Sequence, residues 1–313
     1  MSISQSNPPV PSRPLVIASS QAHKTTLIIL HGRGSTAEKF AEPLLQHVVS
    51  AIDGKTIENR ETSASSKTFQ QHLPNTKFVF PTAPLRRAVV FKRSLTHQWF
   101  DNWSLTQPEL KQHLQVPGLR ETSVFLHDLL REEIKTIGAE NVVLMGLSQG
   151  CAVSTIAALL WQGEPFGALI GMCGYLPFRK SMQDYIEESD DRDSDSFVGS
   201  EADGDDMFER DGEDRDERSR YGKAVDWLRE ELRSGEELEV LSSASPSLQS
   251  IPVFMGHGKD DERVPHTFGK LAADFLDSIN VDVTWKEYEG LGHWYSEDML
   301  RDVIEFLKEK VKG

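Results

Sequence analysis

A serine in the motif Gly146-Leu-Ser-Gln-Gly150 is the first candidate for chemistry in this sequence. An apolar run from Val142 to Met145 precedes it, and a helix-like stretch from Cys151 to Trp161 follows it. Between a strand and a helix, the pattern G-x-S-x-G predicts a tight turn that presents Ser148 as a nucleophile, and only glycine fits beside it. Such a pattern arises by chance about once in ten chains of this length, so the motif alone does not establish a catalytic serine. The acid and the base that would act with Ser148 have to be found elsewhere in the chain.

An acid and a base follow later predicted strands. His293 comes after the last predicted strand, and Asp260 and Asp261 come shortly after the strand predicted at 251–255. A histidine there can take the proton of Ser148, and an aspartate can fix the histidine tautomer and stabilise the imidazolium. The spacing alone does not choose between the two aspartates.

Acyl transfer also needs hydrogen-bond donors for the oxyanion that develops on the substrate. We expect the backbone N–H of Gln149, directly after the serine, to supply one. The second is expected from His31-Gly-Arg-Gly34, which follows the apolar strand predicted at 25–30, and within it from the N–H of Arg33. Small residues there let the backbone approach a substrate. The pattern assigns no role to the Arg33 side chain.

Apolar strands alternate with helical segments along most of the chain, which predicts an α/β fold with a mostly parallel sheet covered by helices on both faces. Ligands bind at the carboxyl ends of the strands in such sheets. The expected strands lie at 25–30, 77–80, 142–145, 166–172, 251–255 and 281–288.

Two segments lack the composition of a packed core. Residues 1–22 are rich in Ser and Pro, and we expect a disordered tail before a domain at 23–313. Residues 184–220 hold 17 Asp or Glu and 5 Arg, a net charge of −12 out of −15 for the whole chain, which predicts a disordered acidic insertion. The default interpretation is a solvated loop, and the alternative is a docking segment for a basic partner or a phosphorylation target.

Overall composition excludes several classes of partner. A net charge of −15 argues against nucleic acid and anionic membrane surfaces. The two cysteines form no disulfide framework and no zinc-binding spacing, so we expect a cytoplasmic protein without a bound metal. No apolar run reaches the roughly 18 residues that span a membrane, so no transmembrane segment is expected.

Large apolar residues gather in the long polar segment from 81 to 118: Trp99, Phe100, Trp103 and Leu105. Such residues in a long loop either line a substrate pocket or pack the loop onto the core. Both interpretations stay open, and we take the four as candidate substrate-binding residues.

Seven blocks in order resemble those of one enzyme family, the acyl-protein thioesterase or phospholipase–carboxylesterase family of α/β-hydrolases. The blocks are Leu30-His-Gly-Arg-Gly34, Phe80-Pro-Thr-Ala-Pro84, Trp99-Phe-Asp101, Gly146-Leu-Ser-Gln-Gly150, Cys173-Gly-Tyr-Leu-Pro177, His257-Gly-Lys-Asp-Asp-Glu-Arg-Val-Pro265 and Tyr288-Glu-Gly-Leu-Gly-His293. The resemblance implies the α/β-hydrolase fold, Ser148 as nucleophile, Asp261 as acid and His293 as base. It also implies an oxyanion hole from the N–H groups of Arg33 and Gln149, an acyl site shaped by the block at Trp99, and no cofactor.

The chain departs from the family pattern near the site. Cys151 stands where a second glycine is usual, and Lys259 and Glu262 stand where Asp and Pro are usual. Arg33 and Ser35 replace an apolar residue and an Asp. The catalytic set is retained, and the departures concern substrate preference.

The sequence therefore predicts a serine hydrolase that cleaves acyl esters or thioesters through an acyl-enzyme, without metal or cofactor. A long-chain acyl thioester on a protein cysteine is the favoured substrate. The alternatives are a general carboxylesterase or lysophospholipase on small or lipid esters, and a non-catalytic binding protein that holds a basic partner through the acidic insertion.

Overall fold

A seven-stranded sheet forms the centre of the protein in a computed structural model that describes residues 13–50, 66–195, 219–233 and 248–311. The strand order is β1-β5-β2-β8-β9-β10-β11, and only the edge strand β1 runs antiparallel to its neighbour. The strands are β1 (Leu15–Ile17), β2 (Thr25–Leu30), β5 (Thr76–Phe80), β8 (Val142–Leu147), β9 (Ala168–Met172), β10 (Val253–Gly258) and β11 (Val283–Tyr288).

The register of the central strands brings their carboxyl ends together. Leu30 of β2 pairs with Gly146 of β8, and Leu147 of β8 pairs with Met172 of β9. On the other side, the last residue of β10, Gly258, pairs with Tyr288 of β11. The loops after β2, β8, β10 and β11 therefore leave the sheet at one edge, where ligands bind in parallel sheets.

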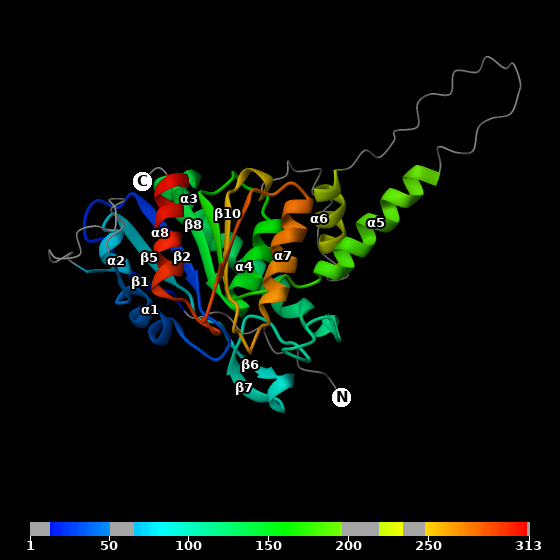
Figure 1. Ribbon diagram of the computed structural model, residues 1–313, viewed down its shortest axis with the longest axis horizontal. Coiled ribbons are helices and arrows are strands. Elements are labelled where there is room, and N and C mark those ends of the chain that lie inside the picture. The colour runs from blue at the N-terminus through cyan, green and yellow to red at the C-terminus, as the bar shows by residue number, and fades with distance from the viewer. Residues whose placement is uncertain (1–12, 51–65, 196–218, 234–247, 312–313) are drawn as a thin grey trace, which may run out of the picture.

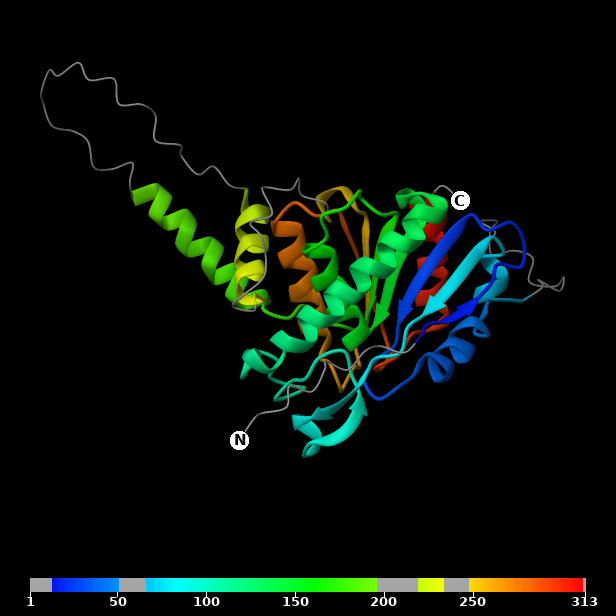
Figure 2. The same ribbon diagram turned by 180° about the vertical axis from the view of Figure 1, so that it is seen from behind.

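Helices cover both faces of the sheet, as the sequence predicts (Figures 1 and 2). One face packs against α1 (Ala37–Leu45) and α8 (Glu297–Lys310), and the opposite face against α3 (Val116–Ile137), α4 (Gln149–Leu159) and α7 (His266–Ser278). The central strands β2, β8, β9 and β10 are fully buried, because helices cover both faces of the parallel sheet there, whereas the edge strands β1 and β11 are partly exposed. None of the described helices combines the length and apolarity needed to cross a membrane.

The acidic insertion predicted to be disordered at 184–220 begins as a helix. Helix α5 runs through Arg179–Asp195, and α6 (Arg220–Glu231) packs against it (Figure 2). Met182 and Ile186 are fully buried on one stripe of α5, so the helix is anchored to the core despite its acidic surface. The prediction of disorder is therefore wrong for 184–195, and residues 196–218 lie outside the described part of the chain.

The predicted N-terminal tail also contains an ordered element. Strand β1 lies within residues 1–22 and pairs along its length with β5, while Leu15 and Ile17 pack against the core beneath the sheet. A three-residue apolar strand inside a Ser- and Pro-rich segment gives too short a pattern to recognise. The prediction of a disordered tail is wrong at Leu15–Ile17, and residues 1–12 are outside the described chain.

The long segment from 81 to 118 is more structured than expected. It contains a hairpin of β6 (Leu85–Ala88) and β7 (Ser94–His97), which projects at the carboxyl edge of the sheet (Figures 1 and 2). The N–H of Gly34 donates to the carbonyl of His97 at 2.8 Å, so the hairpin is tied to the loop after β2. The remaining small elements are β3 (Val48–Val49), β4 (Lys67–Thr68) and α2 (Phe69–His72).

Candidate active site

Ser148 sits at the tip of the turn between β8 and α4 in a conformation that is rare outside glycine, with φ 57° and ψ −118°. Its N–H donates to the carbonyl of Met172 at 2.8 Å, which fixes the turn to β9. A Cβ on Gly146 would lie 2.4 Å from the Gly150 backbone, and one on Gly150 would lie 2.5 Å from the Leu30 carbonyl oxygen. The tight strand–turn–helix predicted from the motif is present, and the backbone packing explains both glycines.

The predicted base and acid meet the serine in one chain of hydrogen bonds. His293 Nε2 lies 2.9 Å from Ser148 Oγ, and His293 Nδ1 lies 2.7 Å from Asp261 Oδ2. An ionised carboxylate only accepts, so the imidazole proton sits on Nδ1 and leaves Nε2 to accept from the serine hydroxyl. Asp260 is exposed, so the geometry distinguishes the two adjacent aspartates that the spacing left open.

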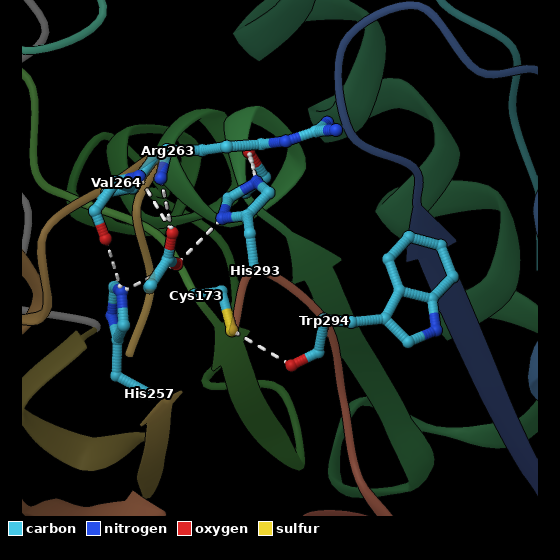
Figure 3. A network of polar contacts seen from close by, with 8 residues as sticks. Cys173, His257, Arg263, Val264, His293 and Trp294 are labelled. Carbon is cyan, nitrogen blue, oxygen red and sulfur yellow. Dashed lines mark hydrogen bonds and ion pairs between the residues drawn. The ribbon is translucent and has the colours of Figure 1, made fainter. Parts of the chain in front are cut away.

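The carboxylate of Asp261 is held from several sides (Figure 3). Its Oδ1 accepts from the N–H groups of Arg263 at 2.9 Å and Val264 at 2.8 Å, and its Oδ2 also receives His257 Nε2 at 3.1 Å. Burial alone would raise the pKa of Asp261, but the hydrogen bonds from His257, His293 and Val264 outweigh it and hold the pKa well below its ordinary value. The acid is therefore ionised at neutral pH and fixed in position.

His257 contacts both the backbone and the acid. Its Nε2 lies 2.9 Å from the Val264 carbonyl oxygen, and the same nitrogen also reaches the Asp261 carboxylate. This second contact to the acid is a feature that the sequence analysis missed. The only sequence signal for it is the spacing of four residues between His257, in β10, and Asp261, in the loop that follows.

The two predicted oxyanion donors lie beside the serine. A Cβ on Gly32 would be 3.4 Å from Ser148 Cβ, so the loop that carries Arg33 runs against the nucleophile. Gln149 is the first residue of α4, where backbone N–H groups have no partner inside the helix. Within the described residues, neither the Arg33 nor the Gln149 N–H donates to a protein acceptor.

The loop after β2 is fixed by a buried neutral histidine. Burial lowers the pKa of His31 to about 4, so its ring donates from Nδ1 to the Gly32 carbonyl at 2.7 Å and accepts the Ala83 N–H at Nε2 at 3.1 Å. The indole N–H of Trp99 donates to the His31 carbonyl at 2.8 Å. These contacts position the backbone that carries Arg33.

Trp99 and Phe100 do not line an open substrate surface, because both side chains are completely buried. Their backbone is fixed by the side chain of Gln149, whose Oε1 accepts the Trp99 N–H at 2.9 Å and whose Nε2 donates to the Phe100 carbonyl at 2.6 Å. The assignment of these two residues to substrate binding is corrected to a positioning role. Trp103 and Leu105 keep about 40% of their surface exposed, 43% and 39%, and stay candidates for substrate contact.

A small hollow of about 40 Å³ opens between residues 108–112, the segment after β9 and the first turns of α7. Its lining combines polar Glu109, Gln112 and Arg179 with apolar side chains that include Leu176, Phe178, Phe268 and Leu271. The segment after β9 reaches the nucleophile at Gly174, where a Cβ would lie 3.2 Å from the Ser148 carbonyl oxygen. The sequence analysis did not identify this hollow, because its walls come from segments far apart in the chain.

The site provides a serine hydroxyl with a base in contact, an ionised acid behind the base, and two unpaired N–H groups beside the serine. This set permits nucleophilic acyl transfer. Among the described residues, no three His, Cys, Asp or Glu side chains gather in a way that could hold a metal ion.

Comparisons with known proteins identify the family of the chain. The family model described as phospholipase/carboxylesterase matches residues 59–191 and 237–311. Acyl-protein thioesterase 1 of Gibberella zeae is 24% identical to this chain over 301 residues, which cover 95% of each protein. Carboxylesterase SOBER1 of Arabidopsis thaliana is 24% identical over 247 residues, which cover 77% of this chain and 80% of the relative. The crystal structure of Zea mays acyl-protein thioesterase 2 shares the fold with a TM-score of 0.61 at 18% identity, covering 96% of this chain and 99% of that one. With the family model matching well over half of its length, the chain belongs to the phospholipase/carboxylesterase family of α/β-hydrolases.

Proposed function

We propose that this protein is a serine hydrolase that cleaves acyl esters and thioesters through an acyl-enzyme on Ser148. The observation that carries the proposal is the unbroken contact from Ser148 Oγ to His293 Nε2 at 2.9 Å and from His293 Nδ1 to Asp261 at 2.7 Å. Membership of an esterase family supports the same reaction class.

The proposed reaction follows from the positions of these groups. His293 takes the proton of Ser148 as the oxygen attacks the acyl carbon, and Asp261 stabilises the imidazolium that results. The N–H groups of Arg33 and Gln149 receive the oxyanion of the tetrahedral intermediate. His293 then protonates the departing oxygen or sulfur, and a water molecule activated by the same histidine hydrolyses the acyl-enzyme.

A long-chain acyl thioester on a protein cysteine is the substrate that we propose first, in a cytoplasmic setting. Relatives named acyl-protein thioesterase 1 support it, as do the partly exposed side chains of Trp103 and Leu105. The second candidate is a carboxylesterase acting on small esters, which the similarity to SOBER1 favours. A lysophospholipase or a non-catalytic partner of basic proteins ranks below both.

Labelling with a fluorophosphonate probe tests the reaction class. The wild-type protein should be labelled and Ser148→Ala should not, while Asp260→Asn should be labelled like the wild type because its side chain is outside the hydrogen-bond chain. Absence of labelling in the wild type would favour the non-catalytic alternative.

Acyl-chain length separates the two substrate candidates. Each methylene that becomes buried contributes up to about 0.8 kcal/mol, so kcat/KM should rise about two- to fourfold per methylene until the groove is full. Esters and thioesters of two to sixteen carbons provide the measurement. A maximum at two to four carbons would refute the long-chain assignment and leave the carboxylesterase. If Trp103 or Leu105 lines the groove, its replacement by Ala should flatten the rise for long chains and leave acetate esters unaffected.

A further inference from the structure

Arg33 is a half-buried cation in the loop beside the nucleophile, and most of its hydrogen-bonding capacity is unused. Its Nη2 donates to Asn102 Oδ1, but Nε and Nη1 are buried and have no partner. The guanidinium lies over the ring of Phe91, 5.9 Å from the centroid. Leaving such donors unpaired in a buried site is unfavourable, so their arrangement points to a group that is bound during function.

In the described part of the chain, no carboxylate contacts this cation. Tyr175 and Asp101 act on its pKa only from a distance. The Asp101 carboxylate instead accepts the N–H groups of Val89 at 3.1 Å and Asn102 at 2.9 Å. Burial therefore lowers the pKa of the guanidinium without a compensating contact.

A second buried donor faces the same region. Tyr175 is 8% exposed, and its hydroxyl makes no hydrogen bond of normal geometry, although the Asn102 side chain lies close enough to lower its pKa. Burial raises the pKa of Tyr175, and the charge of Arg33 lies close enough to oppose that rise, so the hydroxyl is a neutral donor at neutral pH. The two side chains reach this region from the loops after β2 and β9, on either side of the nucleophile.

We infer that Arg33 and Tyr175 form a subsite for an anionic group, a carboxylate or a phosphate, carried by the substrate one side-chain length from the scissile carbonyl. Such a group can accept from one edge of the guanidinium, through Nη1 or Nε together with the second N–H of Nη2, and from the tyrosine hydroxyl. A guanidinium is suited to this recognition because its fork of donors matches carboxylate and phosphate oxygens. Arg33 keeps some exposed surface, from which a ligand can approach. This inference rests on the proposed hydrolysis and narrows its substrates to those with a negative charge near the acyl bond.

The charge can lie on the acyl group or on the leaving group, and paired substrates distinguish the two. For the acyl side, the mono-4-nitrophenyl ester of adipic acid is compared with its uncharged half-amide, each corrected for spontaneous hydrolysis. For the leaving-group side, a 1-acylglycerol 3-phosphate is compared with the 1-acylglycerol of the same chain by release of free fatty acid. In at least one pair, kcat/KM of the wild type for the anionic member should exceed that for the neutral member about tenfold or more, as expected for charge-assisted hydrogen bonds.

The variants are judged by this ratio within each protein, so that changes in the common chemistry cancel. Arg33→Met keeps the aliphatic stem and should bring the ratio to within about twofold of unity, because no charged hydrogen bond remains. Tyr175→Phe should lower the ratio part of the way. Arg87→Met, which removes an exposed cation from the neighbouring hairpin, should leave it unchanged.

A ratio near unity for both wild-type pairs, or a high ratio that survives in Arg33→Met, would overturn the subsite. An equal loss of preference in Arg87→Met would do the same, because it would assign the effect to overall charge. These results leave the proposed hydrolase intact as long as the neutral esters are turned over. Failure of the wild type to hydrolyse any member of either pair would instead count against the proposed function.

Discussion

Asp261→Asn is the sharpest test of the catalytic assignment, because the carboxylate has four contacts and an amide can satisfy only part of them. Oδ1 accepts two backbone N–H groups, from Arg263 and Val264, and Oδ2 faces His293 and His257. An asparagine has one oxygen and one NH₂ group to place on these two sides. The orientation of the asparagine amide therefore determines how much catalytic activity is lost.

If the amide NH₂ faced the backbone, two buried N–H donors would lose their acceptor, at about 1–3 kcal/mol each. We therefore expect the amide oxygen to stay on the backbone side and the NH₂ to face His293. That group donates to Nδ1, which moves the imidazole proton to Nε2, so the ring can no longer accept from Ser148 Oγ. Loss of the correct tautomer should lower kcat by about 10³–10⁴ while the protein stays folded.

Initial rates on a 4-nitrophenyl ester measure this effect, with circular dichroism as the folding check. The matched control is Asp260→Asn, which alters an exposed carboxylate one residue away and should change kcat by less than about twofold, as surface substitutions generally do. A loss under tenfold in Asp261→Asn, or a larger loss in Asp260→Asn, would refute the assignment of the acid.

Four further outcomes are expected. Ser148→Ala should remove at least about 10³ of kcat, and wild-type-like turnover in a folded variant would end the hydrolase proposal. Gln149→Met should lower both the melting temperature and kcat, because it leaves the buried Trp99 N–H without an acceptor at a cost of about 1–3 kcal/mol; unchanged melting would show that the loop is held otherwise. Ile186→Ala should destabilise the fold by about 2–5 kcal/mol in denaturant unfolding, since the side chain is 1% exposed; a neutral result would mean that α5 is not anchored to the core. The folded state holds the pKa of Asp261 below its ordinary value of 3.8, so the ionised carboxylate stabilises the fold above about pH 4, and this stabilisation is lost as pH falls through the lowered pKa. The difference in melting temperature between the wild type and Asp261→Asn should therefore shrink on acidification. A difference that stays constant with pH would contradict the hydrogen bonds assigned to Asp261.

Much of the catalytic centre can be predicted from the sequence, because its constraints are local. Close backbone contacts at one turn require glycine at positions 146 and 150. A serine between two such glycines, at the junction of a strand and a helix, is typical of a catalytic nucleophile. Choosing Asp261 over Asp260 needed a resemblance between whole blocks, because neighbouring residues in a loop have no periodicity that separates them.

The burial of Trp99 and Phe100 could not be predicted from the residues around them in the sequence. Whether Trp99 covers a pocket or fills the core depends on the partners of its indole and backbone N–H groups, which are His31 and Gln149. His31 lies 68 positions from Trp99 in the sequence, and Gln149 lies 50 positions from it. A pattern of apolar residues in one segment carries no information on such contacts.

Helix α5 shows the opposite problem, in which composition hides a local signal. The acidic residues dominate the average, but Met182 and Ile186 are four positions apart and form a buried stripe. Lys180 and Asp184 pair on the exposed side at 2.7 Å, which adds support at the same spacing. A prediction that weighs periodicity before net charge would have placed a helix at the start of the acidic run.

The contact between Ser148 and His293 joins residues 145 positions apart, and it has a consequence for how the protein gains activity as it refolds. The nucleophile and both oxyanion donors belong to the first half of the chain, but the base is fixed only when β11 has paired with β10 at the edge of the sheet. Parallel strands that are distant in sequence pair slowly, because the intervening chain has to be ordered first. Hydrolysis should therefore return no earlier than the last strand, and a chain that ends before Val283 would carry Ser148 without a base to activate it.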